Sequence, residues 1–342
     1  MRVGLMLPTL FSVSSPVNGV LVLAEATRSA LQSCPDVEVV ALNPWEHALE
    51  GLDLIHAFGG PEGYSGGRLE TGVPWVLTPV HDSLQPRWKY RAAVRVGSLH
   101  PRLRTIPAEK SILYRSVDRL TVLSSDEATR ISQSCDVPID RISVVHAAVS
   151  EPPSIDPDAA MQFLALHDVG DDYCLAVCDY SSRRKNIERL ILACQNAGLP
   201  LVLAGRVRQT PVLTSIEKLA RKGEVKLLGF VDGAVADALM ARCRVYCQPS
   251  IEEGAGMAAM RAALHGAPIL ATDVGGAAEH LGPYARYVDP FDVRSIAGGL
   301  SDLWFREGVV PSVGDWIRQN RTWSHSVAEL LNAYRLALRA VC

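Results

Sequence analysis

The chain has 342 residues, a length that allows about two domains, each large enough to bury its own core. Apolar residues make up 48% of the chain and charged residues 21%, a balance that excludes a disordered or collagen-like chain. The net charge is -3, so there is no overall positive field and nucleic acid is not expected as a partner. No apolar run is long enough to span a bilayer and no leader cleavage site follows the first residues, so we expect a cytoplasmic protein.

Short apolar runs of strand length alternate with longer amphipathic runs, which is typical of parallel sheets covered by helices. The Pro- and acid-rich stretch 150–158 predicts a linker between two such sets. We therefore expect an α/β protein with doubly wound domains over 1–152 and 158–315, followed by helices over 316–342 that pack back toward the first domain. The predicted strands are Arg2–Met6, Val37–Leu42, Leu52–Phe58, Pro74–Val80, Arg119–Ser124, Tyr173–Cys178, Leu199–Gly205, Val225–Phe230, Arg244–Ser250, Pro268–Asp273 and Tyr284–Pro290.

The eight cysteines are scattered along the chain and form no C-x-x-C pair. Their closest spacing, C-x-x-x-C, occurs inside the apolar run YCLAVC and is not typical of a zinc site. We therefore expect buried thiols that behave as small apolar side chains, and no metal site.

The segment 248–273, QPSIEEGAGMAAMRAALHGAPILATD, carries the clearest chemical signal. A strand ends there, a glycine-rich turn follows, and a helix opens near Met257. Gly254 and Gly256 permit close backbone approach, and the first N–H groups of the helix would attract an anion such as a diphosphate. A flexible turn with an acidic helix cap is the alternative interpretation. Because a glutamate repels phosphate, we expect at least one of the turn's two adjacent glutamates to bond a neutral group such as a sugar hydroxyl.

Residues 249–282, PSIEEGAGMAAMRAALHGAPILATDVGGAAEHLG, together with DYSSRRKNIERLILA, VPIDRISVVHAAVS and TWSHSVAELLNAYRLAL, resemble the motifs of the retaining family-4 glycosyltransferases. The resemblance covers nearly the whole chain. It implies the GT-B architecture, two Rossmann-like domains that face a central cleft, with a nucleotide sugar held by the second domain.

The resemblance also implies roles for individual residues. It places Gly19 near the donor phosphate and His81 against the donor sugar, gives Lys185 the task of neutralising the diphosphate, and gives Glu253 that of holding a sugar hydroxyl. A histidine that caps a strand and an ordinary surface lysine are the alternatives for His81 and Lys185. Further donor contacts are implied for Asp179, Arg184, Gly254, Ala255, Gly256, Met257, Ala258 and Arg261.

Two of these positions carry a charge opposite to that of the family. Asp179 stands where the family has an arginine that pairs with phosphate, and Arg261 stands where it has a glutamate that binds ribose. A guanidinium can only donate hydrogen bonds to a ribose. If both residues line the nucleotide site, we expect their side chains to pair with each other or to reach the ribose.

The resemblance implies a retaining transfer of a sugar from a nucleotide diphosphate sugar to a hydroxyl of a glycan, glycolipid or small molecule, with no metal and no cofactor. The two reversed charges leave open a second interpretation, a catalytically impaired protein of this fold that acts as a binding or activating partner. A two-domain small-molecule binding protein would explain the domains but not the ordered motifs.

Residues 84–119 form a strongly basic segment, with nine basic residues against two acidic ones and a local charge of +7. Arg87, Arg91 and Arg95 share one predicted helical face, and Trp88 lies beside them. This composition suits an anionic lipid surface or an anionic acceptor, whereas a solvated basic helix is the ordinary alternative. The segment therefore predicts peripheral attachment to the cytoplasmic face of a membrane.

Overall fold

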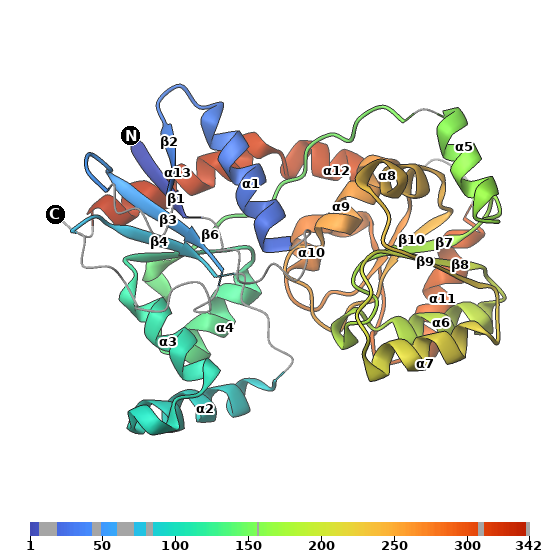
Figure 1. Ribbon diagram of the computed structural model, residues 1–342, viewed down its shortest axis with the longest axis horizontal. Coiled ribbons are helices and arrows are strands. Elements are labelled where there is room, and N and C mark those ends of the chain that lie inside the picture. Colours follow the sequence, from blue (N-terminus) through green and yellow to red (C-terminus); the bar gives the residue numbers. More distant parts are fainter. Residues whose placement is uncertain are drawn as a thin grey trace. The chain divides into compact units, whose positions relative to one another are not determined.

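The computed structural model describes residues 1–6, 19–42, 49–59, 72–79, 85–155, 157–306 and 311–339. The chain divides into two compact units: Met1–Ala147 with Trp323–Cys342, and Ala148–Thr322 (Figure 1). Each unit has its own six-stranded parallel sheet with helices on both faces. The expected α/β class with two doubly wound domains is therefore confirmed.

In the first unit the strand order is β2-β1-β3-β4-β5-β6. Helices α1 and α13 cover one face of this sheet, while α3 and α4 cover the other and carry α2 on their outer side (Figure 1). The strands are β1 (Arg2–Met6), β2 (Glu38–Leu42), β3 (Leu54–Phe58), β4 (Trp75–Thr78), β5 (Arg119–Val122) and β6 (Ile142–Val144). The helices are α1 (Gly19–Gln32), α2 (Arg87–Leu99), α3 (Ile106–Ser116), α4 (Ser125–Cys135) and α13 (Trp323–Arg339), with 3-10 turns η3 (Pro101–Leu103) and η4 (Ile139–Arg141).

In the second unit the strand order is β12-β11-β10-β7-β8-β9. One face packs against α6, α7 and α11, and the other against α5, α8, α9, α10 and α12. The strands are β7 (Cys174–Val177), β8 (Leu201–Ala204), β9 (Val225–Gly229), β10 (Val245–Gln248), β11 (Ile269–Ala271) and β12 (Arg286–Tyr287). The helices are α5 (Pro157–Leu166), α6 (Ile187–Ala197), α7 (Pro211–Ala220), α8 (Gly233–Arg242), α9 (Met257–Leu264), α10 (Ala277–Leu281), α11 (Val293–Trp304) and α12 (Val313–Asn320), with 3-10 turns η5 (Arg183–Lys185) and η6 (Gly282–Tyr284).

All eleven predicted strands form, because each apolar run can be buried between two helical layers, and β6 is an additional strand at the edge of the first sheet. The central strands β3, β8 and β10 are buried at every position. The edge strands β2 and β9 keep exposed or half-buried positions, since an edge strand is covered less completely. The strand β1 has its predicted bounds, and the other predicted strands are a residue or more shorter than their runs, chiefly at the ends where the chain turns away from the sheet.

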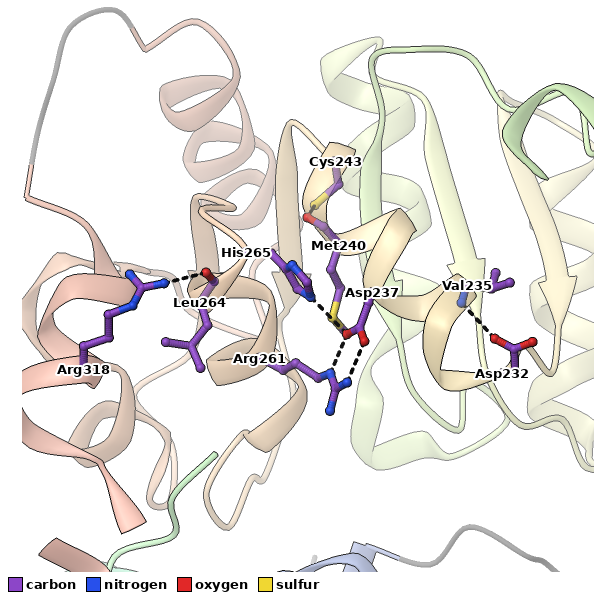
Figure 2. A network of polar contacts seen from close by, with 9 residues as sticks. All are labelled: Asp232, Val235, Asp237, Met240, Cys243, Arg261, Leu264, His265 and Arg318. Carbon is purple, nitrogen blue, oxygen red and sulfur yellow. Dashed lines mark hydrogen bonds and ion pairs between the residues drawn. The ribbon is translucent and has the colours of Figure 1, made fainter. Parts of the chain in front are cut away.

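The two C-terminal helices belong to different units, which changes the expected boundary at residue 316. Helix α12 packs on α9 of the second unit, where Gly314 allows an approach so close that a Cβ would lie 2.3 Å from the carbonyl oxygen of Ala263. Arg318 of α12 also donates a 2.8 Å hydrogen bond to the carbonyl of Leu264 (Figure 2). Of the two C-terminal helices, α13 is the one that packs on the sheet of the first unit.

Candidate functional site

A buried ion pair joins two loops at the carboxyl ends of the second sheet. Lys185 ends η5, which follows β7, and Glu253 lies between β10 and α9. The Nζ of Lys185 donates to Oε2 of Glu253 at 2.6 Å, and the hydroxyl of Ser250 donates to the same oxygen at 3.0 Å. The two side chains retain only 15% and 11% of their exposure. The sequence separates these residues by 68 positions, so their pairing is a product of the parallel sheet.

The electrostatics of this pair keep Glu253 ionised. Burial by itself raises the pKa of a carboxyl, but the positive charges of Lys185 and Arg184 and the hydrogen bonds from Lys185 and Ser250 outweigh that effect. The pKa of Glu253 therefore lies below its ordinary value. The site holds one fixed carboxylate and one fixed ammonium. In place of their present pairing, the carboxylate can accept a hydrogen bond from a ligand hydroxyl and the ammonium can donate to an anionic ligand group.

The backbone of Glu253 is locked in place by the loop that follows β11. The N–H of Gly276 donates to the carbonyl of Glu253 at 2.9 Å. Gly275 has a φ of +76°, and a Cβ there would lie 2.3 Å from the same carbonyl oxygen. Only glycine fits such a close approach in this conformation. The glycine pair that follows β11 therefore fixes the orientation of Glu253.

Asn186 ties the loop that carries Lys185 to its neighbours. Its side-chain amide is buried and donates to the carbonyls of Pro249, at 2.9 Å, and Pro290, at 2.7 Å. In addition, the N–H of Ile251 donates to the carbonyl of Arg184 at 2.9 Å. Loops that follow different strands are thus tied together around the ion pair. Lys185 and Glu253 are therefore held in position before a ligand binds.

Helix α9 begins beside this pair, as the sequence predicted. Gly256 precedes its first residue, Met257, and has a φ of +74°. The side-chain amide nitrogen of Gln248 is buried beside Gly256 and has no hydrogen-bond partner within the described residues. An unpartnered buried donor and a helix N-terminus are both groups that favour an acceptor-rich, negatively charged ligand. Of the other predicted contacts in this turn, Ala255 is buried, whereas Gly254 and Ala258 are half-buried.

Asp179 is neutralised by a cation that the sequence analysis did not single out. Its carboxylate accepts from Nη2 of Arg208 at 2.6 Å and from the hydroxyl of Ser181 at 2.5 Å. The backbone N–H of Arg208 in turn donates to the Ser181 hydroxyl at 3.1 Å. Arg208 follows β8, the strand beside β7, so the neighbouring loop supplies the positive charge. The sequence around Arg208, AGRVR, carries no motif that would have singled it out.

Arg261 is likewise held by a residue that the sequence analysis missed. Asp237 of α8 has a side chain that is only 2% exposed, and it accepts from Nε of Arg261 at 2.5 Å and from Nη2 at 2.6 Å (Figure 2). The Nε2 of His265 lies 3.0 Å from the same carboxylate. Although burial works to raise the pKa of Asp237, the hydrogen bonds from Arg261 and His265 bring it below its ordinary value.

The expected pairing between Asp179 and Arg261 is therefore wrong. Each of the two residues has its own local counter-charge, Arg208 for the first and Asp237 for the second. In each case a partner on an adjacent loop or helix neutralises the side chain's charge through short hydrogen bonds, so neither side chain has to reach across the site to the other. The reversed charges are balanced separately and do not close the site by binding each other.

The remaining predicted site residues belong to the first unit. Gly19 is the first residue of α1, and a Cβ on it would meet nothing within 4 Å. His81 lies outside the described residues, so its role stays a prediction. Within the ranges that the structure describes, no group of three or more His, Cys, Asp or Glu side chains is placed to hold a metal ion.

The first unit also contains a buried polar chain that the sequence analysis did not identify. His56 of β3 lies 2.7 Å from the hydroxyl of Tyr334 on α13 and 2.7 Å from the hydroxyl of Thr78, which contacts Thr121 at 2.6 Å. Of these residues, His56, Thr78 and Thr121 line a small hollow together with Thr27 and Ser326, among others. Burial lowers the pKa of His56 to about 3, so the imidazole is neutral. A histidine inside the apolar run LIHAF was the available signal.

Comparison with known proteins finds a family model that matches part of the chain. Residues 168–320 match the model of the glycosyl transferases group 1 family. The O-antigen chain mannosyltransferase B of Escherichia coli is 28% identical over 300 residues, which cover 82% of this chain and 74% of that protein.

Two solved structures share the fold. The sucrose-phosphate synthase of Thermosynechococcus elongatus superimposes with a TM-score of 0.73 at 17% identity, covering 98% of each chain. HepE of Anabaena in complex with UDP-glucose superimposes with a TM-score of 0.68 at 16% identity, covering 96% of this chain and 99% of that one. Residues 168–320 are thus similar to the glycosyl transferases group 1 family, and the whole chain shares with these structures the GT-B fold of two Rossmann-like domains.

Proposed function

We propose that the protein is a retaining glycosyltransferase that moves a sugar from a nucleotide diphosphate sugar to an acceptor hydroxyl without a metal ion. The observation that carries this proposal is the buried pair of Lys185 and Glu253 beside the N-terminus of α9. Such a site offers positive charge for a diphosphate and a carboxylate for a sugar hydroxyl. The group 1 family match over the same unit supports the assignment.

The chemistry follows from where charge develops. The bond between the sugar's anomeric carbon and the diphosphate oxygen breaks, and the acceptor oxygen bonds to that carbon on the same face. The acceptor proton leaves with the departing diphosphate. Lys185 and the first N–H groups of α9 stabilise the growing negative charge, while Glu253 orients the sugar by accepting a hydroxyl proton in a hydrogen bond. His81 is proposed to shape the sugar pocket.

Binding of the nucleotide is the first test. Isothermal titration with UDP, GDP and ADP should give saturable binding to one of them, followed by a screen of the corresponding sugars for hydrolysis. The name of the Escherichia coli relative makes nucleotide-linked mannose the first donor to try. Absence of binding to all three nucleotides would contradict the proposal and favour the catalytically impaired partner that the reversed charges at Asp179 and Arg261 left open.

Variants then test the roles of the pair. Lys185→Ala should lower kcat/KM with the identified donor by at least about a hundredfold, because it removes the ammonium proposed to neutralise the departing diphosphate. Lys226→Ala is the matched control: Lys226 also pairs with a carboxylate in the second unit, that of Asp168, but at the surface. Glu253→Gln should lower kcat/KM by about tenfold or more through a weaker hydrogen bond to the sugar. Unchanged kinetics in both site variants would refute the assigned roles.

We also propose that the basic segment 84–119 attaches the protein to the surface of an anionic membrane, with a glycan or glycolipid as acceptor. The local charge of +7 supports this proposal, because each basic residue near an anionic leaflet favours association. Sedimentation with vesicles tests it. Binding should require anionic lipid and weaken at high salt, and no binding to anionic vesicles at low salt would refute it.

A further inference from the structure

The outer face of α2 carries a second apolar stripe in addition to the one that packs on the protein. Tyr90, Val94 and Gly97 face inward and are buried. Trp88, Val96 and Leu99 are 69%, 48% and 78% exposed. At about 100° per residue, these three side chains fall within about 80° of one another and on the side away from the buried residues. Helix α2 thus has one apolar face that packs in the core and a second apolar face that is exposed to solvent.

Two more exposed apolar residues follow the end of α2 along the chain. Leu103 at the end of η3 is 49% exposed, and Ile106 at the start of α3 is 64% exposed. Five large apolar side chains are therefore exposed within residues 88–106. Isolated exposed apolar residues are ordinary, but a contiguous group on one surface marks a place of interaction. We call Trp88, Val96, Leu99, Leu103 and Ile106 the outer stripe.

Cations flank the outer stripe, and the described part of the chain supplies no acidic partner for most of them. On α2, Arg91 and Arg95 lie to one side of it and Lys89 to the other. No acidic side chain in the described ranges lies within 4 Å of Arg91, Arg95, Arg102 or Arg104. Arg87, by contrast, pairs with Asp126 of α4 at 3.1 Å. The basic residues next to the stripe are thus left for an external partner.

The position of α2 in the first unit leaves the outer stripe accessible. Helix α2 lies at the edge of the unit, with α3 and α4 between it and the sheet (Figure 1). It packs tightly on α3, since a Cβ on Gly97 would lie 2.5 Å from Cβ of Ala108. Because this contact holds α2 firmly, the stripe is presented by a rigid element and can act as one surface.

We infer that the outer stripe inserts into the boundary between headgroups and acyl chains of an anionic bilayer, while the flanking cations contact the lipid phosphates. This inference rests on the membrane attachment proposed above and adds that apolar insertion, and not charge alone, holds the protein there. An apolar stripe between rows of cations is the arrangement of helices that lie in a membrane interface. No helix within the described residues is long and apolar enough to cross a bilayer, so attachment through this surface would be interfacial.

The test compares vesicles of phosphatidylcholine alone with vesicles of equal parts phosphatidylcholine and phosphatidylglycerol. Leu99→Ser should weaken partitioning onto the anionic vesicles by about tenfold, because a large side chain no longer leaves water. Leu166→Ser is the matched control, since Leu166 is 80% exposed in the second unit and should leave partitioning unchanged. Arg91→Gln should weaken binding by about fivefold, whereas Arg294→Gln, also exposed but in the second unit, should not.

Insertion has a direct spectroscopic signature. Lipids brominated on their acyl chains should quench part of the tryptophan fluorescence in the wild type, and that part should be lost in Trp88→Phe. Anionic binding that persists unchanged in Leu99→Ser, without quenching of Trp88, would overturn insertion and leave the electrostatic attachment standing. Absence of binding to every vesicle would overturn both. A dimer in solution that Leu99→Ser dissociates would assign the stripe to self-association and also overturn the inference. Nucleotide binding by titration reports the transferase proposal independently.

Discussion

His56 should make the first unit sensitive to mild acid. In the folded protein its pKa is lowered to about 3 because it is buried, whereas in the unfolded chain the value is 6.5. Between these two values the unfolded state binds the additional proton, so the free energy of unfolding falls as the pH falls. The slope is about 1.4 kcal/mol per pH unit, which amounts to about 2.5 kcal/mol between pH 7 and about pH 4.5. Above about pH 7.5, where the histidine is neutral in both states, this contribution no longer changes.

Hydrogen exchange of peptides that cover β3 and β4, corrected for the intrinsic pH dependence of exchange, measures this effect within the first unit. His56→Gln is the variant, because glutamine keeps a donor and an acceptor but cannot take up the proton in this range. It should remove most of the acid sensitivity of these strands. His100→Gln, at an exposed histidine of the same unit, is the control and should remove none. Equal acid sensitivity in wild type and His56→Gln, or an imidazole of His56 that titrates near 6.5 by NMR, would refute the reasoning.

Three further predictions concern the second unit. Gly275→Ala should lower the free energy of unfolding of this unit, measured by urea denaturation, by more than about 2 kcal/mol, since the new Cβ would meet the carbonyl of Glu253 at a residue with positive φ. Gly298→Ala is the control and should not destabilise the unit, because a Cβ there meets nothing within 4 Å. Asp237→Ala should cost about 3 kcal/mol in the same assay because it removes both bonds that hold the guanidinium of α9; a cost below about 1 kcal/mol would contradict the buried pairing. The effects of Asp179→Ala and Arg261→Ala on nucleotide affinity should add to within about 0.5 kcal/mol, and a larger coupling in the double variant would restore the pairing that the structure excludes.

The layered architecture could be predicted from the sequence because it depends on local patterns. Eleven predicted apolar runs of strand length alternate with amphipathic runs, and this alternation is typical of a parallel sheet buried between helices. The helix that begins at Met257 was also predictable, because a glycine turn directly precedes it. The assignment of Lys185 and Glu253 to one site came from the ordered motifs, not from composition.

The partners of the reversed charges were decided by tertiary structure alone. Nothing in the sequence distinguishes Arg208 or Asp237 from the many other charged residues, since a counter-charge needs only to be close in space. The division of the C-terminal helices between the two units has the same cause: the close approach of α12 to α9 depends on Gly314, whose packing partner lies about fifty residues away along the chain.

The basic segment shows the same division between sequence and structure. Its charge of +7 is a property of composition, and the sequence determined it completely. Which apolar side chains of 84–119 belong to the core and which face outward was decided only when α2 packed on α3 and α4. A helical period places Tyr90 and Trp88 on different faces, but burial of one face depends on the neighbours that cover it, because the hydrophobic effect acts on the area removed from water and not on the residue type.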